Sequence, residues 1–293
     1  MTAAGSLTAA GPTAADTVAQ AVTALFVPGD RPERFGKAAA AGAGVVIIDL
    51  EDAVEPDAKS AALTAAVEAV APSDGGVAVR ALVRVNPQSS GHYDADITLL
   101  LSAARTPGSG LLGIVLPKAE DARALRRLRA DMPKHLALVP LVESALGVVN
   151  AVELARVPGV ARLAFGAIDF ALDIDADGGD RFLDHARSQL VLSSRAAGIA
   201  APLDSPSTDI KDASKVADSA RLARNFGFGG KLCIHPAQLA TVHGAFAPTG
   251  ADVEWALSVI AVQGGAAQVD GQMIDRPVTE RAKRILQRAG KEQ

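Results

Sequence analysis

The chain has 293 residues, of which 49% are hydrophobic and 21% are charged, and its formal net charge at pH 7 is -4. This composition indicates a globular core and argues against a largely disordered chain, and the absence of a basic field argues against nucleic acid as a partner. No uninterrupted apolar run reaches the roughly 18–20 residues that a membrane span requires, and a single cysteine, Cys233, excludes an internal disulfide.

Residues 1–21 are expected to form a flexible tail. The first 20 residues are rich in Ala, Thr and Gly and contain no Lys or Arg. They therefore lack the charged start of a signal peptide and the arginines of a transit peptide. Cys233 lies inside an apolar run, which indicates a buried, inert thiol. The unpaired cysteine predicts a reducing compartment, and we expect a cytoplasmic protein.

Residues 22–245 are expected to form one α/β domain in which short apolar runs alternate with longer Ala/Leu/Arg-rich segments. The runs are continuous in Val, Ile and Leu, as in strands covered on both faces. Strands are predicted at 23–28, 44–50, 77–85, 111–116, 136–142, 161–166, 199–203 and 231–234. Helices are predicted at 31–41, 59–70, 119–130, 147–155, 182–197 and 211–226. This alternation predicts a (β/α)8 TIM barrel rather than a doubly wound sheet, because no Gly-x-Gly-x-x-Gly motif follows the first strand.

The pattern changes in residues 246–293, which are expected to form a C-terminal helical extension. A helix is predicted at 252–262, followed by a Gly-Gly break and then by a basic helix at 278–288. The extension is too short to form a domain of its own. We expect it to pack on the barrel or on a neighbouring subunit.

Charged and polar side chains collect where the predicted strands end, which is where α/β barrels carry their active sites. Strands three to six end in Arg84, Lys118, Glu143 and Asp169. Strand three also gives Asn86, strand two gives Asp49, Glu51 and Asp52, strand seven gives Asp204, and strand eight gives His235. A solvated rim would explain any one of these charges, but their succession favours a shared site. For His235 a structural hydrogen bond is favoured over catalysis.

Glu143 and Asp169 are the candidate metal ligands. Mg²⁺ takes oxygen ligands and usually only one or two protein carboxylates, with substrate and water in the remaining positions. No spacing typical of a zinc site is present. Arg84 adds a planar fork that can hold a substrate carboxylate through two hydrogen bonds. The expected metal is Mg²⁺, with Mn²⁺ as the alternative. A metal ion and Arg84 together suit a 2-oxo acid, because the metal polarises the keto oxygen and Arg84 can hold the carboxylate.

Over roughly residues 22–285 the chain resembles the citrate lyase beta-subunit-like proteins of the HpcH/HpaI aldolase superfamily. The motifs that carry the resemblance are FVPGDRPE (26–33), IDLEDAV (48–54), VRVNP (83–87), LPKAE (116–120), LVES (141–144), FGAIDF (165–170) and GKLCIHP (230–236). As a set they are specific for the family and much less specific for one substrate. The resemblance implies a barrel of the phosphoenolpyruvate/pyruvate-binding type that makes or breaks a carbon–carbon bond in a CoA thioester.

The resemblance also implies roles for individual residues. Glu143 and Asp169 match the positions that bind Mg²⁺ and bring the substrate to it, and Arg84 matches the arginine that holds the substrate carboxylate and takes part in catalysis. Glu51 and Asp52 match acids that lie behind the metal and orient its waters.

Two further cations are candidate substrate contacts. Lys118 is placed by its motif at the rim of the site, where we expect it to contact substrate without forming a Schiff base. Arg31, near the first strand, is a candidate contact for a CoA phosphate, with a plain surface role as the alternative. For His92, His185 and Asp204 nothing in the local sequence decides for or against substrate contact.

Residues 273–275 resemble the lid motif of malyl-CoA, citramalyl-CoA and related lyases. In those enzymes the aspartate reaches into the site of an adjacent subunit, which implies that Asp275 is the general acid/base and that the protein is a homo-oligomer, a trimer or hexamer. The alternative is that Asp275 only caps the helix after Pro277.

The expected function is cleavage or formation of a 3-hydroxyacyl-CoA, such as malyl-CoA, citramalyl-CoA or citryl-CoA, with acetyl-CoA and a 2-oxo acid as the other side of the reaction. Three alternatives remain. One is a citrate lyase beta subunit acting on a thioester carried by an acyl-carrier partner. The others are a metal-dependent aldolase for free hydroxy-oxo acids and a non-catalytic binding subunit. Neither nucleic acid nor membrane is expected as a partner.

Overall fold

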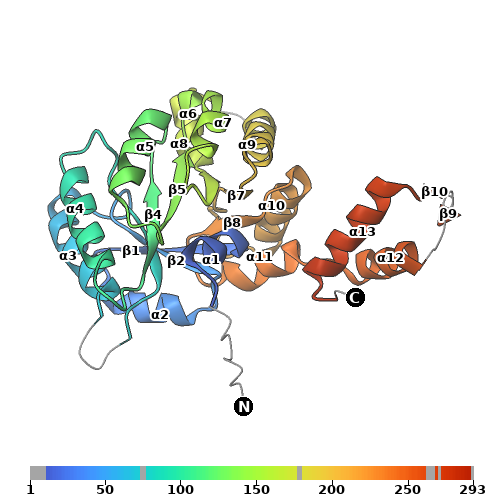
Figure 1. Cartoon of the computed structure of the whole chain (residues 1–293), viewed down its shortest axis with the longest axis horizontal. Coiled ribbons are helices and arrows are strands. Elements are labelled where there is room, and N and C mark those ends of the chain that lie inside the picture. The colour runs from blue at the N-terminus through green and yellow to red at the C-terminus, as the bar shows by residue number, and fades with distance from the viewer. Residues whose placement is uncertain (1–10, 73–76, 177–179, 262–267, 270–271, 292–293) are drawn as a thin grey trace, which may run out of the picture. The chain divides into compact units, whose positions relative to one another are not determined.

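A computed structural model describes residues 11–72, 77–176, 180–261, 268–269 and 272–291. In these ranges, eight parallel strands close into a barrel in chain order, with β1 paired to β8 (Figure 1). The strands are β1 Thr23–Pro28, β2 Val45–Asp49, β3 Ala81–Arg84, β4 Leu111–Leu116, β5 Ala137–Val142, β6 Arg162–Phe165, β7 Ala200–Asp204 and β8 Gly230–Cys233. The predicted barrel is confirmed, and each strand overlaps its predicted range.

Helices connect the strands and surround the barrel (Figure 1). They are α1 Ala14–Gln20, α2 Phe35–Ala40, α3 Lys59–Val70, α4 Tyr93–Ala104, α5 Ala122–Asp131, α6 Ala145–Val149, α7 Ala151–Ala155, α8 Ala167–Asp173, α9 Asp184–Ala197, α10 Ala213–Phe226 and α11 Gln238–Phe246. Short 3-10 helices cover Pro32–Arg34, Pro56–Ala58 and Asp180–Leu183. The helix predicted at 147–155 is divided at Asn150 into α6 and α7.

Apolar side chains from the strands fill the barrel interior. Ile47, Leu82, Val139 and Leu203 are among the buried residues of one continuous cluster there. Because the helices cover the outer face of the same strands, most strands are apolar on both faces, which explains the continuous Val/Ile/Leu runs of the sequence. The interior is therefore packed, and chemistry is left to the strand ends and the loops that follow them.

The expected flexible tail at residues 1–21 is wrong for the part that forms α1. Thr13 caps this helix, accepting a hydrogen bond from the Asp16 N–H while Asp16 accepts one in return from the Thr13 N–H. Val18 is fully buried and belongs to the cluster that fills the barrel interior. Composition concealed this helix because its small residues carry little apolar signal. Residues 1–10 of the expected tail lie outside the described residues.

Arg162, at the start of β6, ties α1 to the barrel. Its Nη1 donates to the carbonyl oxygens of Val18 at 3.1 Å and Ala21 at 2.6 Å, and its Nε donates to the carbonyl of Ala201 at 2.9 Å. The side chain is 1% exposed, and burial lowers the pKa of Arg162 to about 9. This arginine serves backbone carbonyls at the amino-terminal end of the barrel, away from the strand ends where Arg84 lies.

The described chain divides into two compact units, residues 1–243 and 244–293. The second contains α12 Gly250–Ala261, the short strands β9 Gln268–Val269 and β10 Gln272–Met273, and α13 Arg276–Arg288. Its own core is formed by Ala256, Val259, Ala282, Ile285 and Leu286. The two helices overlap the ranges predicted for the extension. None of the helices in the described ranges is long and apolar enough to cross a bilayer.

Candidate active site

The candidate residues come from the carboxyl ends of neighbouring strands. Asp49 ends β2 and Arg84 ends β3, and the two face each other in the parallel register of these strands. Glu143 directly follows β5, and Lys118 lies two residues beyond the end of β4. Asp169 lies in the first turn of α8, the helix that follows β6. The barrel thus places side chains far apart in sequence at one edge.

Arg84 is nearly buried and is contacted from several sides. Its Nε and Nη2 donate to the Oδ1 and Oδ2 atoms of Asp49, each at 2.6 Å. Its Nη1 lies 2.9 Å from Glu51 Oε2 and 3.4 Å from Asp52 Oδ2, and its guanidinium carbon lies 4.9 Å from the centre of the Phe26 ring. Burial acts to lower the pKa of Arg84, but Asp49 outweighs it and the pKa rises, so Arg84 stays a cation.

Glu143 is buried beside Lys118 and Gly166. The backbone N–H of Lys118 donates to Glu143 Oε1 at 2.7 Å, and Lys118 Nζ lies 3.9 Å from the same oxygen and 3.8 Å from Glu51 Oε1. Lys118 has a φ of 49°, a left-handed conformation that is costly for a residue with a side chain and that recurs at functional sites. A Cβ at Gly166 would lie 2.5 Å from Glu143 Oε2, so the carboxylate fits only because residue 166 is glycine.

The group carries more negative than positive charge. Within the described residues the strand-end group comprises five carboxylates and two cations, which gives a formal excess of three negative charges. The carboxylates are Asp49, Glu51, Asp52, Glu143 and Asp169, and the cations are Arg84 and Lys118. Burial raises the pKa of Glu143 to about 8, and the neighbouring charges of Glu51 and Asp169 add to the rise. Burial also raises the pKa of Glu51 to about 7, against the opposing effect of Arg84. Both carboxylates would ionise more readily beside an added cation.

A magnesium ion fits this donor set. No cluster of three or more His, Cys, Asp and Glu that could hold a metal is found among the described residues. A pair of carboxylates, with substrate and water as the other ligands, is nevertheless the protein contribution that Mg²⁺ commonly has. Glu143 is buried and Asp169 half-buried, and each is close enough to the other for their charges to interact. The oxygen donors and the excess of negative charge therefore agree with the sequence prediction of a magnesium site.

Arg31 and Asp275 make contacts with their own neighbours. Arg31 is exposed, and its nearest acid is Asp30, with Arg31 Nε 3.8 Å from Asp30 Oδ2. Asp275 lies in the second unit, where its Oδ1 accepts a hydrogen bond from the Val278 N–H at 3.0 Å and caps α13. The capping role that the sequence left open is present, and a catalytic role of Asp275 stays a prediction.

Other residues at the strand ends make contacts within the protein. Cys233 is buried, and burial raises the pKa of its thiol to about 12, which agrees with the predicted inert thiol. His235 Nδ1 accepts a hydrogen bond from the Ala237 N–H at 3.1 Å, as expected of a residue that shapes the turn after β8. Asn86 and Asp96 are both buried and bonded to each other, with Asn86 Nδ2 donating to Asp96 Oδ2 at 2.7 Å.

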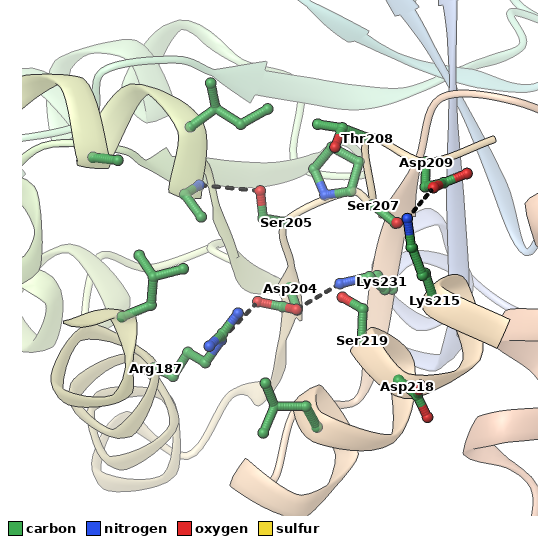
Figure 2. Close-up of a pocket in the computed structure, with 16 residues that line it drawn as sticks. Arg187, Asp204, Ser205, Ser207, Thr208, Asp209, Lys215, Asp218, Ser219 and Lys231 are labelled. Atoms are coloured by element: carbon green, nitrogen blue, oxygen red, sulfur yellow. Dashed lines mark hydrogen bonds and ion pairs between the residues drawn. The ribbon is translucent and has the colours of Figure 1, made fainter. Parts of the chain in front are cut away.

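A separate cavity of about 750 Å³ lies between α8, α9, α10 and the ends of β7 and β8 (Figure 2). Asp204 accepts a hydrogen bond there from Lys231 Nζ at 2.7 Å, and Arg187 Nε lies 3.6 Å from its other oxygen. Asp204 and Lys231 are almost completely buried, so they form an internal ion pair, and substrate contact by Asp204 stays an open possibility of the sequence. Arg84 and Glu143 are not among the described residues that line this cavity.

Sequence reasoning counted Asp49 only as one of several strand-end acids and gave no role to Phe26 or Gly166. The signal for Asp49 was its position in the barrel, because it ends β2 as Arg84 ends β3. The signal for Gly166 was a glycine directly before a helix that carries a candidate metal ligand. Phe26 gave no signal, since an aromatic residue in a strand is ordinarily read as core.

Comparison with known proteins shows which family the chain is similar to. A family model described as HpcH/HpaI aldolase/citrate lyase matches residues 22–236. The chain is 36% identical over 278 residues to the citrate lyase subunit beta-like protein of Deinococcus radiodurans, covering 89% of this chain and 95% of that one. It is 30% identical over 289 residues to the mitochondrial citramalyl-CoA lyase of Homo sapiens, covering 89% and 83%.

A solved structure shows the same likeness in three dimensions. The protein CitE from Mycobacterium tuberculosis, crystallised in complex with magnesium, acetoacetate and coenzyme A, superposes with a TM-score of 0.79 and 35% sequence identity, covering 92% of this chain and 97% of that one. These comparisons confirm the predicted family and the predicted enzyme class, a lyase. The chain is a member of the HpcH/HpaI aldolase/citrate lyase family.

Proposed function

We propose that this protein is a Mg²⁺-dependent carbon–carbon lyase acting on a 3-hydroxyacyl-CoA thioester such as malyl-CoA, citramalyl-CoA or citryl-CoA. The products of cleavage are acetyl-CoA, or propionyl-CoA, and a 2-oxo acid. The observation that carries the proposal is the strand-end group in which Arg84, Glu51, Lys118 and Glu143 are linked by contacts beside Asp169. The complex of the relative CitE with magnesium, acetoacetate and coenzyme A supports it.

Glu143 and Asp169 are the residues that would hold Mg²⁺, or Mn²⁺ in its place. The bound metal supplies a Lewis acid that stabilises negative charge on the substrate oxygen that becomes the keto oxygen. The Lys118 N–H donates a hydrogen bond to Glu143 Oε1, and the lack of a Cβ at Gly166 leaves room for Glu143 Oε2. Glu51 and Asp52 stand beside Arg84, where they can orient water around the metal.

Arg84 would hold the substrate carboxylate through one particular edge of its guanidinium. Asp49 occupies the edge formed by Nε and Nη2, so the edge formed by Nη1 and Nη2 is the one that a substrate can meet. Two acids lie beside Nη1 of that edge: Glu51 Oε2 at 2.9 Å, from a side chain that is 5% exposed, and Asp52 Oδ2 at 3.4 Å, from a side chain that is 58% exposed. Asp52 is therefore the weaker and more easily displaced partner. A substrate carboxylate can therefore take its place.

Two cations are proposed to contact other anionic parts of the substrate. Lys118 has a side chain that is 45% exposed, and its ammonium group lies between Glu51 and Glu143. Burial acts to lower the pKa of Lys118, but Glu143 and Glu51 outweigh it and raise the pKa, so the side chain is charged. Arg31 is exposed near the end of β1, where it can meet a CoA phosphate.

Cleavage requires two proton transfers. The substrate hydroxyl gives its proton to water, the neighbouring carbon–carbon bond breaks, and its electron pair passes to the carbon next to the thioester, giving the acetyl-CoA enolate. That carbon must then be protonated, a step we assign to Asp275 supplied by an adjacent subunit of a homotrimer or hexamer. In the condensation direction the same carboxylate removes the proton.

An assay of the purified chain with malyl-CoA, citramalyl-CoA and citryl-CoA, with and without Mg²⁺, tests the proposal. Mg²⁺-dependent release of a 2-oxo acid and a shorter acyl-CoA by the chain alone is the expected result. Activity that appears only with an acyl-carrier partner would make the protein a citrate lyase beta subunit, and activity on free acids alone would make it an aldolase. No turnover of any of these compounds would leave a binding subunit. The cytoplasmic location also stays a prediction.

A further inference from the structure

Asp49 differs from the other acids of the site in how completely its oxygens are used. Oδ1 accepts hydrogen bonds from Arg84 Nε at 2.6 Å and from the Glu51 N–H at 3.0 Å. Oδ2 accepts from Arg84 Nη2 at 2.6 Å and from the Ala53 N–H at 3.2 Å. A carboxylate has about four lone-pair sites, so these contacts occupy Asp49 fully. With 1% exposure, it is not available to touch metal or substrate.

The same contacts join two parts of the site that come from different elements. Arg84 is the last residue of β3, whereas Glu51 and Ala53 belong to the loop after β2. Asp49 itself is fixed in the barrel wall, opposite Arg84 in the strand register. One buried carboxylate therefore sets both the direction of the guanidinium and the path of the loop that carries Glu51.

We infer that Asp49 is the positioning residue that aims Arg84 at the substrate carboxylate. The inference rests on the role of Arg84 in the proposed function. A guanidinium is planar and rigid, so fixing its Nε–Nη2 edge also fixes the direction of its Nη1–Nη2 edge. The Phe26 ring lies against the guanidinium, its centre 4.9 Å from the guanidinium carbon, and limits tilting out of that plane. Without Asp49, the long arginine side chain would have to be ordered by the substrate itself.

A merely structural role for Asp49, as the counter-charge of a buried arginine, makes a different prediction. In that case removing the Asp49 charge would lower the stability of the protein, and the effect would be the same whether residue 84 is arginine or lysine. A double-mutant cycle between residues 49 and 84 separates the two roles. Asp49→Asn keeps the size and removes the charge, and Arg84→Lys keeps the charge and removes the planar fork.

The first measurement is calorimetric binding of pyruvate to the full chain at saturating Mg²⁺. Asp49→Asn is expected to weaken pyruvate binding about 10- to 100-fold, the range for losing hydrogen bonds to a charged group, while Mg²⁺ binding alone changes little. In the Arg84→Lys background the same substitution is expected to have no further effect. The matched control is Asp218→Asn, which alters an exposed Asp–Arg pair with Arg221 on α10. Unchanged pyruvate affinity in Asp49→Asn, or an equal loss in both backgrounds, would overturn the inference.

The second measurement does not depend on the substrate. The Arg84 Nε–H resonance, identified by its loss in Arg84→Lys, is expected to be protected from solvent exchange in the wild-type protein and to lose protection in Asp49→Asn. If the wild-type chain binds no pyruvate, the proposed function fails. The exchange measurement still shows whether Asp49 fixes the direction of the Arg84 guanidinium. Should Asp49→Asn not fold, Asp49→Glu is used, because it keeps the charge and displaces the carboxylate by one methylene. Wild-type pyruvate affinity and Nε–H protection in that variant would contradict the inference.

Discussion

Replacing Glu143 with Gln should remove a large part of the pH dependence of stability of the metal-free protein between pH 6 and 9. Glu143 is 3% exposed, and burial raises its pKa from an ordinary value of 4.5 to about 8. Below pH 4.5 the carboxyl group is protonated in both the folded and the unfolded chain, so the shift has no effect. Above it the unfolded chain ionises first, and the free energy of unfolding decreases until the folded carboxyl also ionises.

The size of the effect follows from the interval over which the two states differ. From pH 6 to about pH 8 the unfolded glutamate is ionised and the folded one keeps its proton, so each pH unit removes about 1.4 kcal/mol and the total is about 3 kcal/mol. In a domain of this size 1 kcal/mol changes Tm by about 2–4 °C, so the loss corresponds to roughly 6–12 °C. Glu143→Gln carries no titrating group at this position and should lack this part of the decrease.

Thermal unfolding of the chelator-treated protein from pH 6 to 9 measures the effect. The wild type is compared with Glu143→Gln and with Glu153→Gln, a control in which the same change is made at an exposed position of α7. Added Mg²⁺ should stabilise the wild type and the control, and should have much less effect on Glu143→Gln. The reasoning is refuted if Glu143→Gln shows the same dependence of Tm on pH as the wild type, or gains as much from Mg²⁺.

Three further substitutions test the site. Asp169→Ala should reduce Mg²⁺-dependent turnover more than about 100-fold in a steady-state assay, and full activity would exclude Asp169 as a ligand. Gly166→Ala, whose Cβ would lie 2.5 Å from Glu143 Oε2, should lower Mg²⁺ affinity about tenfold in a calorimetric titration, whereas wild-type affinity would show that this oxygen is not needed. Asp275→Asn should leave Tm nearly unchanged, since asparagine also caps helices, and should slow turnover and the exchange of the acetyl-CoA methyl protons with deuterium by about 10²- to 10⁴-fold. Retained exchange in Asp275→Asn would restrict Asp275 to the capping role.

The barrel could be predicted from the sequence because its signal is repeated and local. Each strand is a short, continuous apolar run, and a segment long enough for a helix lies between most of them. Helix α1 could not be predicted in this way. Val18 is a single apolar residue in an Ala/Thr-rich stretch, and its burial depends on the distant Arg162, which donates hydrogen bonds to the backbone of this segment.

The candidate site shows the same division between local and tertiary information. Arg84, Lys118, Glu143 and Asp169 are visible because each is a charge at or just beyond the end of an apolar run. The partnership of Asp49 with Arg84 is not visible, because 35 residues separate them and only the pairing of β2 with β3 brings them together. The candidate residues can thus be read from the sequence, whereas the strand register decides which edge of Arg84 is occupied by Asp49.

Hydrogen bonding distinguishes the fully bonded Asp49 from Glu143, the carboxylate that is proposed to bind the metal. Asp49 accepts two hydrogen bonds at each oxygen, and the cation it contacts is buried with it, so its charge is compensated within the protein. Glu143 receives one short backbone hydrogen bond at Oε1, and the nearest cation, Lys118, is 3.9 Å away and partly exposed. A buried carboxylate whose charge is so weakly compensated retains its proton more readily, which agrees with the raised pKa of Glu143. Glu143 is therefore the less compensated of these two buried carboxylates, as we expect of an acid that is to receive a cation from solution, and hydrogen bonding rather than place in the chain distinguishes it from Asp49.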